Sequence, residues 1–189
     1  MEFPVSIGFI GGVGTLRLLM TDRDGRECGC FAGVSGYLKG IVYAKQTEAK
    51  PLYAIEWTYK NTEYQFATAS GEKLGSMKRT PRRSIWQAHY VIRNGETPVL
   101  EIVEDNPWVK VLDTIVELVP LVGRFTGLFL NPTYTVARPG GAPLLRLVKE
   151  RSVYEYHFSV HQVGPIEPRE REVALLALLM FIQRENTRG

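Results

Sequence analysis

The densest run of cations in the chain is MKRTPRR at residues 77–83. It places four positive charges within six positions, at Lys78, Arg79, Arg82 and Arg83. Clustered cations hold phosphate oxygens, and the arginine fork binds them in a bidentate manner. The run therefore predicts either an anion-binding loop or a solvated turn between two strands. Nucleic acid is not expected as the anion, because stacking aromatic side chains are absent from the run apart from the neighbouring Trp86.

A second candidate is the glycine-rich stretch IGFIGGVG at residues 7–14. A dinucleotide-binding turn needs G-x-G-x-x-G at the start of a helix, so that the helix N-terminus faces the pyrophosphate. Counted from Gly12, the third glycine position is Arg17, and the residues that follow have the pattern of strand, turn and strand. The stretch is therefore predicted to be a strand, and no cofactor is expected.

The histidines and cysteines do not form a metal-binding pattern. His157 and His161 lie in a segment with strand character, where four residues separate them by about 13 Å, too far to share one ion. Cys28 and Cys30 are too close along one strand for the usual disulfide geometry. No second cysteine pair follows that would complete a zinc site, so no metal is expected.

No arrangement typical of a catalytic site appears. The serines and histidines are not united by a G-x-S-x-G elbow. Glu101, Glu104 and Asp105 form an acidic group, but the sequence around them is not a calcium-binding loop. The chain is therefore expected not to be an enzyme.

Most of the chain is typical of short antiparallel strands. Segments rich in Tyr, Val, Ile, Thr and Trp alternate with turn dipeptides such as Asp24-Gly25, Asn94-Gly95 and Gly140-Gly141, which tolerate the positive φ of tight hairpins. The predicted strands are Leu16–Met20, Glu27–Phe31, Leu38–Ala44, Tyr53–Tyr59, Tyr64–Ala69, Leu74–Lys78, Trp86–Arg93, Val99–Val103, Thr133–Ala137, Leu144–Lys149 and Tyr154–Val163.

One amphipathic helix is predicted at about residues 107–119. Asn106 is a suitable N-cap, and Pro107 suits the first helical position. Apolar residues then recur at helical spacing opposite charged ones. This helix is expected to lie on the surface of the sheet and to end before Pro120.

A second helix, at about residues 168–186, has no polar face in its central part. Such a helix is buried in protein or inserted in a membrane. Its apolar run, Val173 to Ile182, is ten residues long, or about 15 Å, against a hydrocarbon core of about 30 Å. The run is too short to span a bilayer, so the strands are expected to wrap around the helix as a closed barrel.

An internal repeat supports two related β units. Residues 70–92 align with residues 140–160, with Leu74 on Leu145, Met77 on Val148 and Lys78 on Lys149. After three extra residues in the first copy, His89 aligns with His157 and Tyr90 with Phe158. The extra residues, Thr80-Pro81-Arg82, lie inside the cationic run.

Composition limits the number of domains and the kind of anionic partner. The 189 residues suit one domain over 1–189, and 23 Lys and Arg against 20 Asp and Glu give a net charge of only +3. Any anionic partner must therefore be bound by a local patch. The start lacks the pattern of a signal peptide, so a cytoplasmic location is expected, with peripheral contact to a membrane as an option.

Four segments of the chain resemble the tubby C-terminal-like superfamily. They are the hairpins GEKLGSMKR and GAPLLRLVKE, the segment FLNPTYTV and the terminal EREVALLALLMFI. That superfamily includes tubby proteins, LURP-one-related proteins and phospholipid scramblases. The resemblance covers roughly residues 52–184. It implies a mainly β (α+β) fold, a closed antiparallel barrel of about twelve strands around the C-terminal helix, and phosphoinositide binding.

These observations predict a non-enzymatic module that recognises anionic phospholipid head groups through Lys78, Arg79, Arg82 and Arg83. One alternative is a structural or regulatory domain that binds a protein partner through helix 107–119. Another, raised by the resemblance, is a scramblase-like lipid protein.

Overall fold

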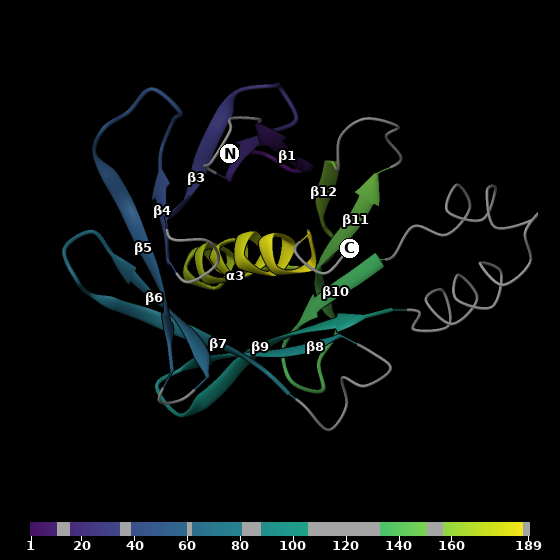
Figure 1. Ribbon diagram of the computed structural model, residues 1–189. Coiled ribbons are helices and arrows are strands. Elements are labelled where there is room, and N and C mark those ends of the chain that lie inside the picture. The colour runs from purple at the N-terminus through teal and green to yellow at the C-terminus, as the bar shows by residue number, and fades with distance from the viewer. Residues whose placement is uncertain are drawn as a thin grey trace, which may run out of the picture.

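Twelve antiparallel strands form a closed barrel, and one helix runs through it (Figure 1). This holds for the residues that the computed structural model describes, which are 1–10, 16–34, 39–59, 62–80, 88–105, 133–150 and 157–186. The strands are β1 (Val5–Ile10), β2 (Arg17–Thr21), β3 (Glu27–Val34), β4 (Lys39–Tyr43), β5 (Pro51–Thr58), β6 (Glu63–Thr68), β7 (Lys73–Arg79), β8 (His89–Asn94), β9 (Thr97–Glu104), β10 (Thr133–Ala137), β11 (Pro143–Glu150) and β12 (His157–Gln162). Each strand pairs with its neighbours in sequence, and β1 closes the ring by pairing with β12.

The predicted fold class, a barrel around a C-terminal helix, is confirmed. The glycine-rich stretch supplies β1, as expected, up to Ile10, and residues 11–15 lie outside the described residues. The tight turns are also as predicted, with Gly25 at φ 75° and Gly95 at φ 59°. The predicted helix 107–119 lies outside the described residues, as do the first residues of the strands predicted from Trp86 and Tyr154.

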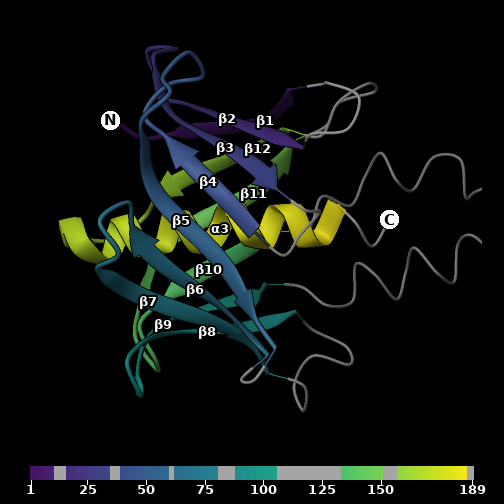
Figure 2. The ribbon, with the colours of Figure 1, turned by 60° about the vertical axis from the view of Figure 1, so that its left-hand side comes forward.

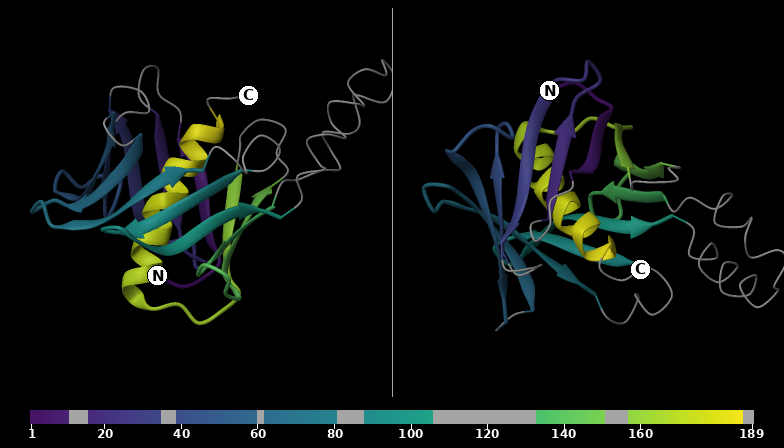
Figure 3. Two further views of the ribbon diagram at one scale, coloured as in Figure 1. Left: turned by 90° about the horizontal axis from the view of Figure 1, so that it is seen from below. Right: turned by 45° about the horizontal axis from the view of Figure 1, so that its top comes forward.

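The helix α3 (Pro168–Asn186) begins with a capping arrangement. Pro168 occupies the first helical position, and the Glu170 carboxylate accepts a hydrogen bond of 3.2 Å from the backbone amide of Glu167. The apolar run from Val173 to Ile182 is then buried on every side. Figures 2 and 3 show why, because the helix lies along the length of the barrel and strands surround it. The predicted burial of this helix is thus confirmed.

No helix in the part of the chain that the structure describes combines the length and the apolarity needed to cross a membrane.

Aromatic side chains fix the last turns of α3 against the barrel wall. Phe181 meets Tyr90 of β8 and Tyr134 of β10 edge-on, with ring centroids 5.4 Å and 4.6 Å apart. Farther along the helix, the guanidinium of Arg184 lies 5.7 Å from the ring centroid of Trp57. The end of the barrel where α3 finishes is called its C-terminal end. At the other end, called the N-terminal end, Arg138 pairs with Glu170 of the helix, and Glu72 pairs with Arg169.

In the pairing registers of the two hairpins, the first half of the predicted repeat alignment is offset by one residue. Met77 is buried opposite Ile92, and the residue in the corresponding place of the second hairpin is Leu147, buried opposite Val160. Arg79 opposite Tyr90 therefore corresponds to Lys149 opposite Phe158. The offset arises at the start of β11. Leu144 and Leu145 are both buried there, beside an irregularity in the β10–β11 pairing. Either leucine can therefore be aligned with Leu74 in the sequence.

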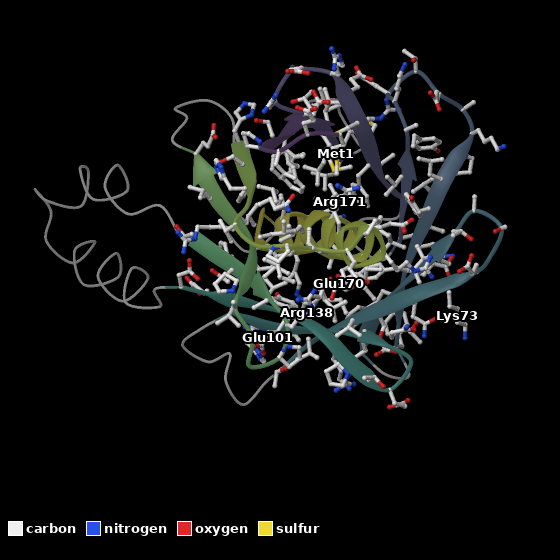
Figure 4. All side chains as sticks on the ribbon, turned by 180° about the vertical axis from the view of Figure 1, so that it is seen from behind. Met1, Lys73, Glu101, Arg138, Glu170 and Arg171 are labelled. Atoms are coloured by element: carbon white, nitrogen blue, oxygen red, sulfur yellow. The ribbon has the colours of Figure 1, made fainter. Side chains whose placement is uncertain are left out.

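At the N-terminal end of the barrel, Arg138 holds Glu170 through two hydrogen bonds of 2.8 Å and 2.7 Å (Figure 4). These bonds lower the pKa of Glu170. A carboxyl whose pKa is lowered on folding stabilises the protein above its unfolded pKa, and this stabilisation is lost as the pH falls through the folded pKa.

We expect the substitution Glu170→Gln to lower the melting temperature near neutral pH, and we expect the difference from wild type to shrink as the medium is acidified below the pKa of ordinary carboxyl groups. Thermal unfolding followed by circular dichroism across this pH range measures both effects. The matched control is Glu48→Gln, at an exposed turn residue. A Glu170→Gln deficit that persists unchanged at low pH would contradict the role of the ion pair.

Candidate functional site

Lys78 and Arg79 end strand β7 and point to opposite faces of the barrel. Lys78 pairs across the ladder with Glu63 and Val91, on the outer face. Arg79 pairs with Tyr90, whose buried ring contacts the central helix. Opposed residues of antiparallel strands share a face, and successive residues alternate, so Arg79 points inward. The other two predicted cations, Arg82 and Arg83, lie outside the described residues.

Arg79 lies beside the last turns of α3. Its neighbour Tyr90 packs against Phe181, and Arg184 follows three residues later on the helix. The guanidinium of Arg184 stacks over Trp57, which holds it at the inner rim of the barrel. Two guanidinium groups from different elements therefore lie inside the C-terminal end of the barrel.

Lys149 supplies a third cation at this end. It pairs with Phe158, whose ring belongs to the buried core, so its side chain also starts on the inner face. Its place in the second hairpin is that of Arg79 in the first. Arg79, Lys149 and Arg184 are called the inner cations below, and each is half-buried.

One buried acid faces the same region. Glu104, at the end of β9, is fully buried and pairs with Tyr134, which contacts Phe181. Its carboxylate accepts a hydrogen bond of 3.1 Å from the backbone amide of Ala88. Glu104 therefore places one carboxylate among the groups at this end of the barrel.

The strand ends that border the gaps in the described ranges all lie at this end. Every connection that the described strands leave open starts and finishes at the C-terminal end of the barrel, and residues 187–189 follow α3 there. In sequence, these segments contain seven Lys or Arg and three Asp or Glu, a net +4 against +3 for the whole chain. The described residues therefore sum to −1.

The histidines have structural partners. Nε2 of His89 lies 3.0 Å from Glu101, and Nε2 of His161 lies 3.1 Å from the hydroxyl of Ser159. The ring of His157 covers Gly8, where a Cβ would come within 2.9 Å of its Nδ1. Among the residues placed by the structure, no three His, Cys, Asp or Glu side chains are grouped to hold a metal ion.

The two cysteines are free thiols, which confirms the prediction that they do not pair. Burial, followed by the nearby Asp22 charge, raises the pKa of Cys28 to about 11. Burial also raises the pKa of Cys30. Both groups are therefore protonated at neutral pH and poor nucleophiles.

The fold and the site together define a class of protein, a closed antiparallel barrel around a buried C-terminal helix with inward cations at the end where the helix finishes. Comparisons with family models, curated proteins and solved structures find no match.

Two of the inner cations, Lys149 and Arg184, were missed by the sequence interpretation. The repeat contains the information needed to find Lys149. The predicted alignment, offset by one residue, placed Lys149 on Lys78 instead of Arg79. Arg184 had no such signal, because a cation in the last turn of a helix is typically there to favour the helix dipole.

Proposed function

We propose that this protein is a non-enzymatic module that recognises anionic phospholipid head groups at a membrane surface, with the C-terminal end of its barrel facing the lipid. The observation that carries the proposal is the equivalence of Arg79 and Lys149. Two hairpins related by the repeat each place a cation on the inner face of one rim, beside Arg184 of the helix.

The chemistry of these groups suits phosphate. Arginine offers a planar fork that matches two phosphate oxygens, and lysine adds a point charge. Each Lys or Arg near an anionic bilayer contributes about 1 kcal/mol of attraction. Lys78 on the outer face adds to the same end, and so do Arg82 and Arg83 through their place in the chain between β7 and β8.

The location of the charge also favours a surface. All the connections that carry the net +4 begin and end at the rim of the inner cations. The opposite end has exposed cations as well, but its arginines largely face acids, as in the pairs of Arg23 with Glu2 and of Arg169 with Glu72.

The resemblance to tubby-like proteins is consistent with this proposal, since it implies both a barrel of this kind and phosphoinositide binding. The proposal places the protein in the cytoplasm, in peripheral contact with a membrane.

The test is vesicle co-sedimentation of the full chain, with phosphatidylcholine vesicles that contain or lack phosphatidylinositol bisphosphate. We expect binding only with the anionic lipid, and we expect it to weaken as ionic strength rises. Changing Lys78, Arg79, Arg82 and Arg83 to Ala is expected to weaken binding by at least about tenfold.

The matched control removes the same charge from the other end, by changing the exposed Arg23, Arg26, Lys45 and Lys50 to Ala. Its binding should stay close to that of wild type. Equal loss in both variants would mean that only net charge matters, and unchanged binding in the first variant would remove the cationic run from the site. Either result contradicts the proposal.

A further inference from the structure

A cavity of about 380 Å³ opens at the N-terminal end of the barrel, between α3 and the wall formed by strands β2 to β5. Its helix side is one face of the first three turns, and its wall side comes from residues at the ends of the strands. The lining residues are Met1, Met20, Cys28, Val42, Tyr43, Leu52, Tyr53, Pro168, Arg171, Glu172, Leu175, Leu176 and Leu179.

The cavity exists because α3 is off-centre in the barrel. The helix backbone approaches strands β7 and β9. At Gly75 of β7 an added Cβ would lie 3.5 Å from Val173, and Ala177 lies one turn farther along the same helix face. Val173 therefore lies close to β7 at Gly75. A ring of twelve strands is wider than one helix, so space remains on the opposite side, at β2 and β3.

Apolar side chains face one another across this space. Leu175, Leu176 and Leu179 form the helix side, and Met20 and Val42 face them. At the rim, Leu52 is 40% exposed and Met1 is 44% exposed, which is unusual for large apolar side chains in the described part of the chain. Concave apolar surface with a few polar groups is typical of small-molecule sites.

The polar groups of the cavity differ in whether they are already paired. Burial, followed by the neighbouring Glu172 carboxylate, raises the pKa of Tyr53 to about 12. The same carboxylate lies 4.0 Å from the guanidinium of Arg169. The acid that lines the cavity is therefore occupied.

Arg171 differs from the arginines beside it. Arg138 is held by Glu170, and Arg169 by Glu72. The half-buried side chain of Arg171 lines the cavity and makes no hydrogen bond or ion pair with any residue within the described ranges. Figure 4 shows Arg171 and Met1 on one side of α3, with Arg138 and Glu170 on the other.

A cation in this position does not stabilise the helix. Arg171 lies in the second turn from the helix N-terminus, where the helix dipole disfavours positive charge. Its unpaired charge at the mouth of an apolar cavity is complementary to a ligand with one anionic group and an apolar body.

We propose that this cavity binds an aliphatic monocarboxylate, with its chain between α3 and strands β2 to β5 and its carboxylate on the guanidinium of Arg171. The Arg171 fork can donate two parallel hydrogen bonds to one carboxylate. The volume lies at the low end of the range of about 300 to 1,000 Å³ for ligand sites. It therefore suits a chain of medium length rather than a whole phospholipid.

The test is calorimetric titration of the full chain with decanoate and, separately, with decanol and decylamine. Wild type should bind decanoate in a one-to-one complex, and decanol about tenfold or more weakly, because the alcohol lacks the charged partner for Arg171. Decylamine should bind most weakly of the three. Equal affinity for the carboxylate and the amine would overturn the assignment of the polar group.

Two arginine variants locate the contact. Arg171→Gln is expected to weaken decanoate binding by about tenfold or more and to leave decanol binding unchanged. The matched control Arg26→Gln, at an exposed arginine in the β2–β3 turn at the same end of the barrel and absent from the lining, should bind decanoate like wild type. Loss in both variants, or in neither, contradicts the proposal.

A third variant and an independent readout test the cavity itself. Val42→Trp should fill the space and abolish binding of decanoate and decanol alike, with thermal unfolding used to confirm that the variant folds. If it does not fold, protection of Cys28 decides: in a Cys30→Ala chain, decanoate should slow alkylation of Cys28 at alkaline pH, since this thiol lines the cavity. An unchanged alkylation rate at saturating decanoate would refute the site.

Vesicle binding should not respond to Arg171→Gln, which separates this site from the proposed lipid surface.

Discussion

Replacing Leu178 with Asp is expected to leave no folded protein. Leu178 lies in the middle of α3 and is fully buried. An unpaired carboxylate in that position costs several kcal/mol, against a total stability of about 5–15 kcal/mol for a typical domain. Loss of the cooperative thermal transition measured by circular dichroism would be the result. A folded variant would show that α3 leaves the barrel readily, and it would contradict the burial of the helix.

The milder pair Leu178→Ala and Leu175→Ala keeps this test informative when the charged variant fails to fold. Leu178 is packed on all sides, whereas Leu175 borders the cavity. Leu178→Ala should cost about 2–5 kcal/mol. Leu175→Ala should cost less, because fewer contacts are lost where space already exists. Denaturant unfolding of both variants measures the difference, and equal costs would argue against the off-centre position of α3.

The fold could be predicted from sequence because one feature restricts it strongly. The run from Val173 to Ile182 is apolar on all faces yet too short for a bilayer. Strands must then surround it, and the turn dipeptides along the chain indicate many short antiparallel strands. The structure has this arrangement, with α3 at the bounds expected from the sequence.

The site was less accessible to sequence reasoning. A cluster of cations along the chain suggests a common patch, but Lys78 and Arg79 are successive strand residues and so point to opposite faces. The partners of Arg79 at the rim come from β11 and α3, far away in sequence. Only the pairing register shows that Lys149 and Arg79 occupy matching places.

The cavity could not be predicted at all. It depends on which wall α3 approaches, and the structure shows that this wall is formed by β7 and β9. In sequence, Arg171 appears as one of several charges at the start of an apolar helix. Its unpaired state emerges only when Arg138 and Arg169 are seen to have acids of their own.

The two proposals assign different chemistry to the two ends of the barrel. The C-terminal end carries the inner cations and faces anionic head groups. The N-terminal end carries an apolar cavity for a small carboxylate. Because Arg171 and Arg184 lie near opposite ends of α3, each end can be tested in variants that leave the other unchanged.

The orientation of the barrel on a bilayer tests the central claim most directly. In a chain whose Cys28 and Cys30 are replaced by Ala, a single cysteine at position 59 or position 48 carries a fluorescent label. Tyr59 follows β5 at the C-terminal end and is 74% exposed, and Glu48 is exposed in the β4–β5 turn at the opposite end. Nitroxide-labelled lipid in phosphoinositide vesicles then quenches whichever label lies at the membrane.

The account predicts strong quenching of the Tyr59→Cys label and little of the Glu48→Cys label, with both effects lost when the phosphoinositide is omitted. Quenching of the Glu48→Cys label alone, or of both labels equally, would show that the cationic end does not face the lipid and would contradict the proposed function.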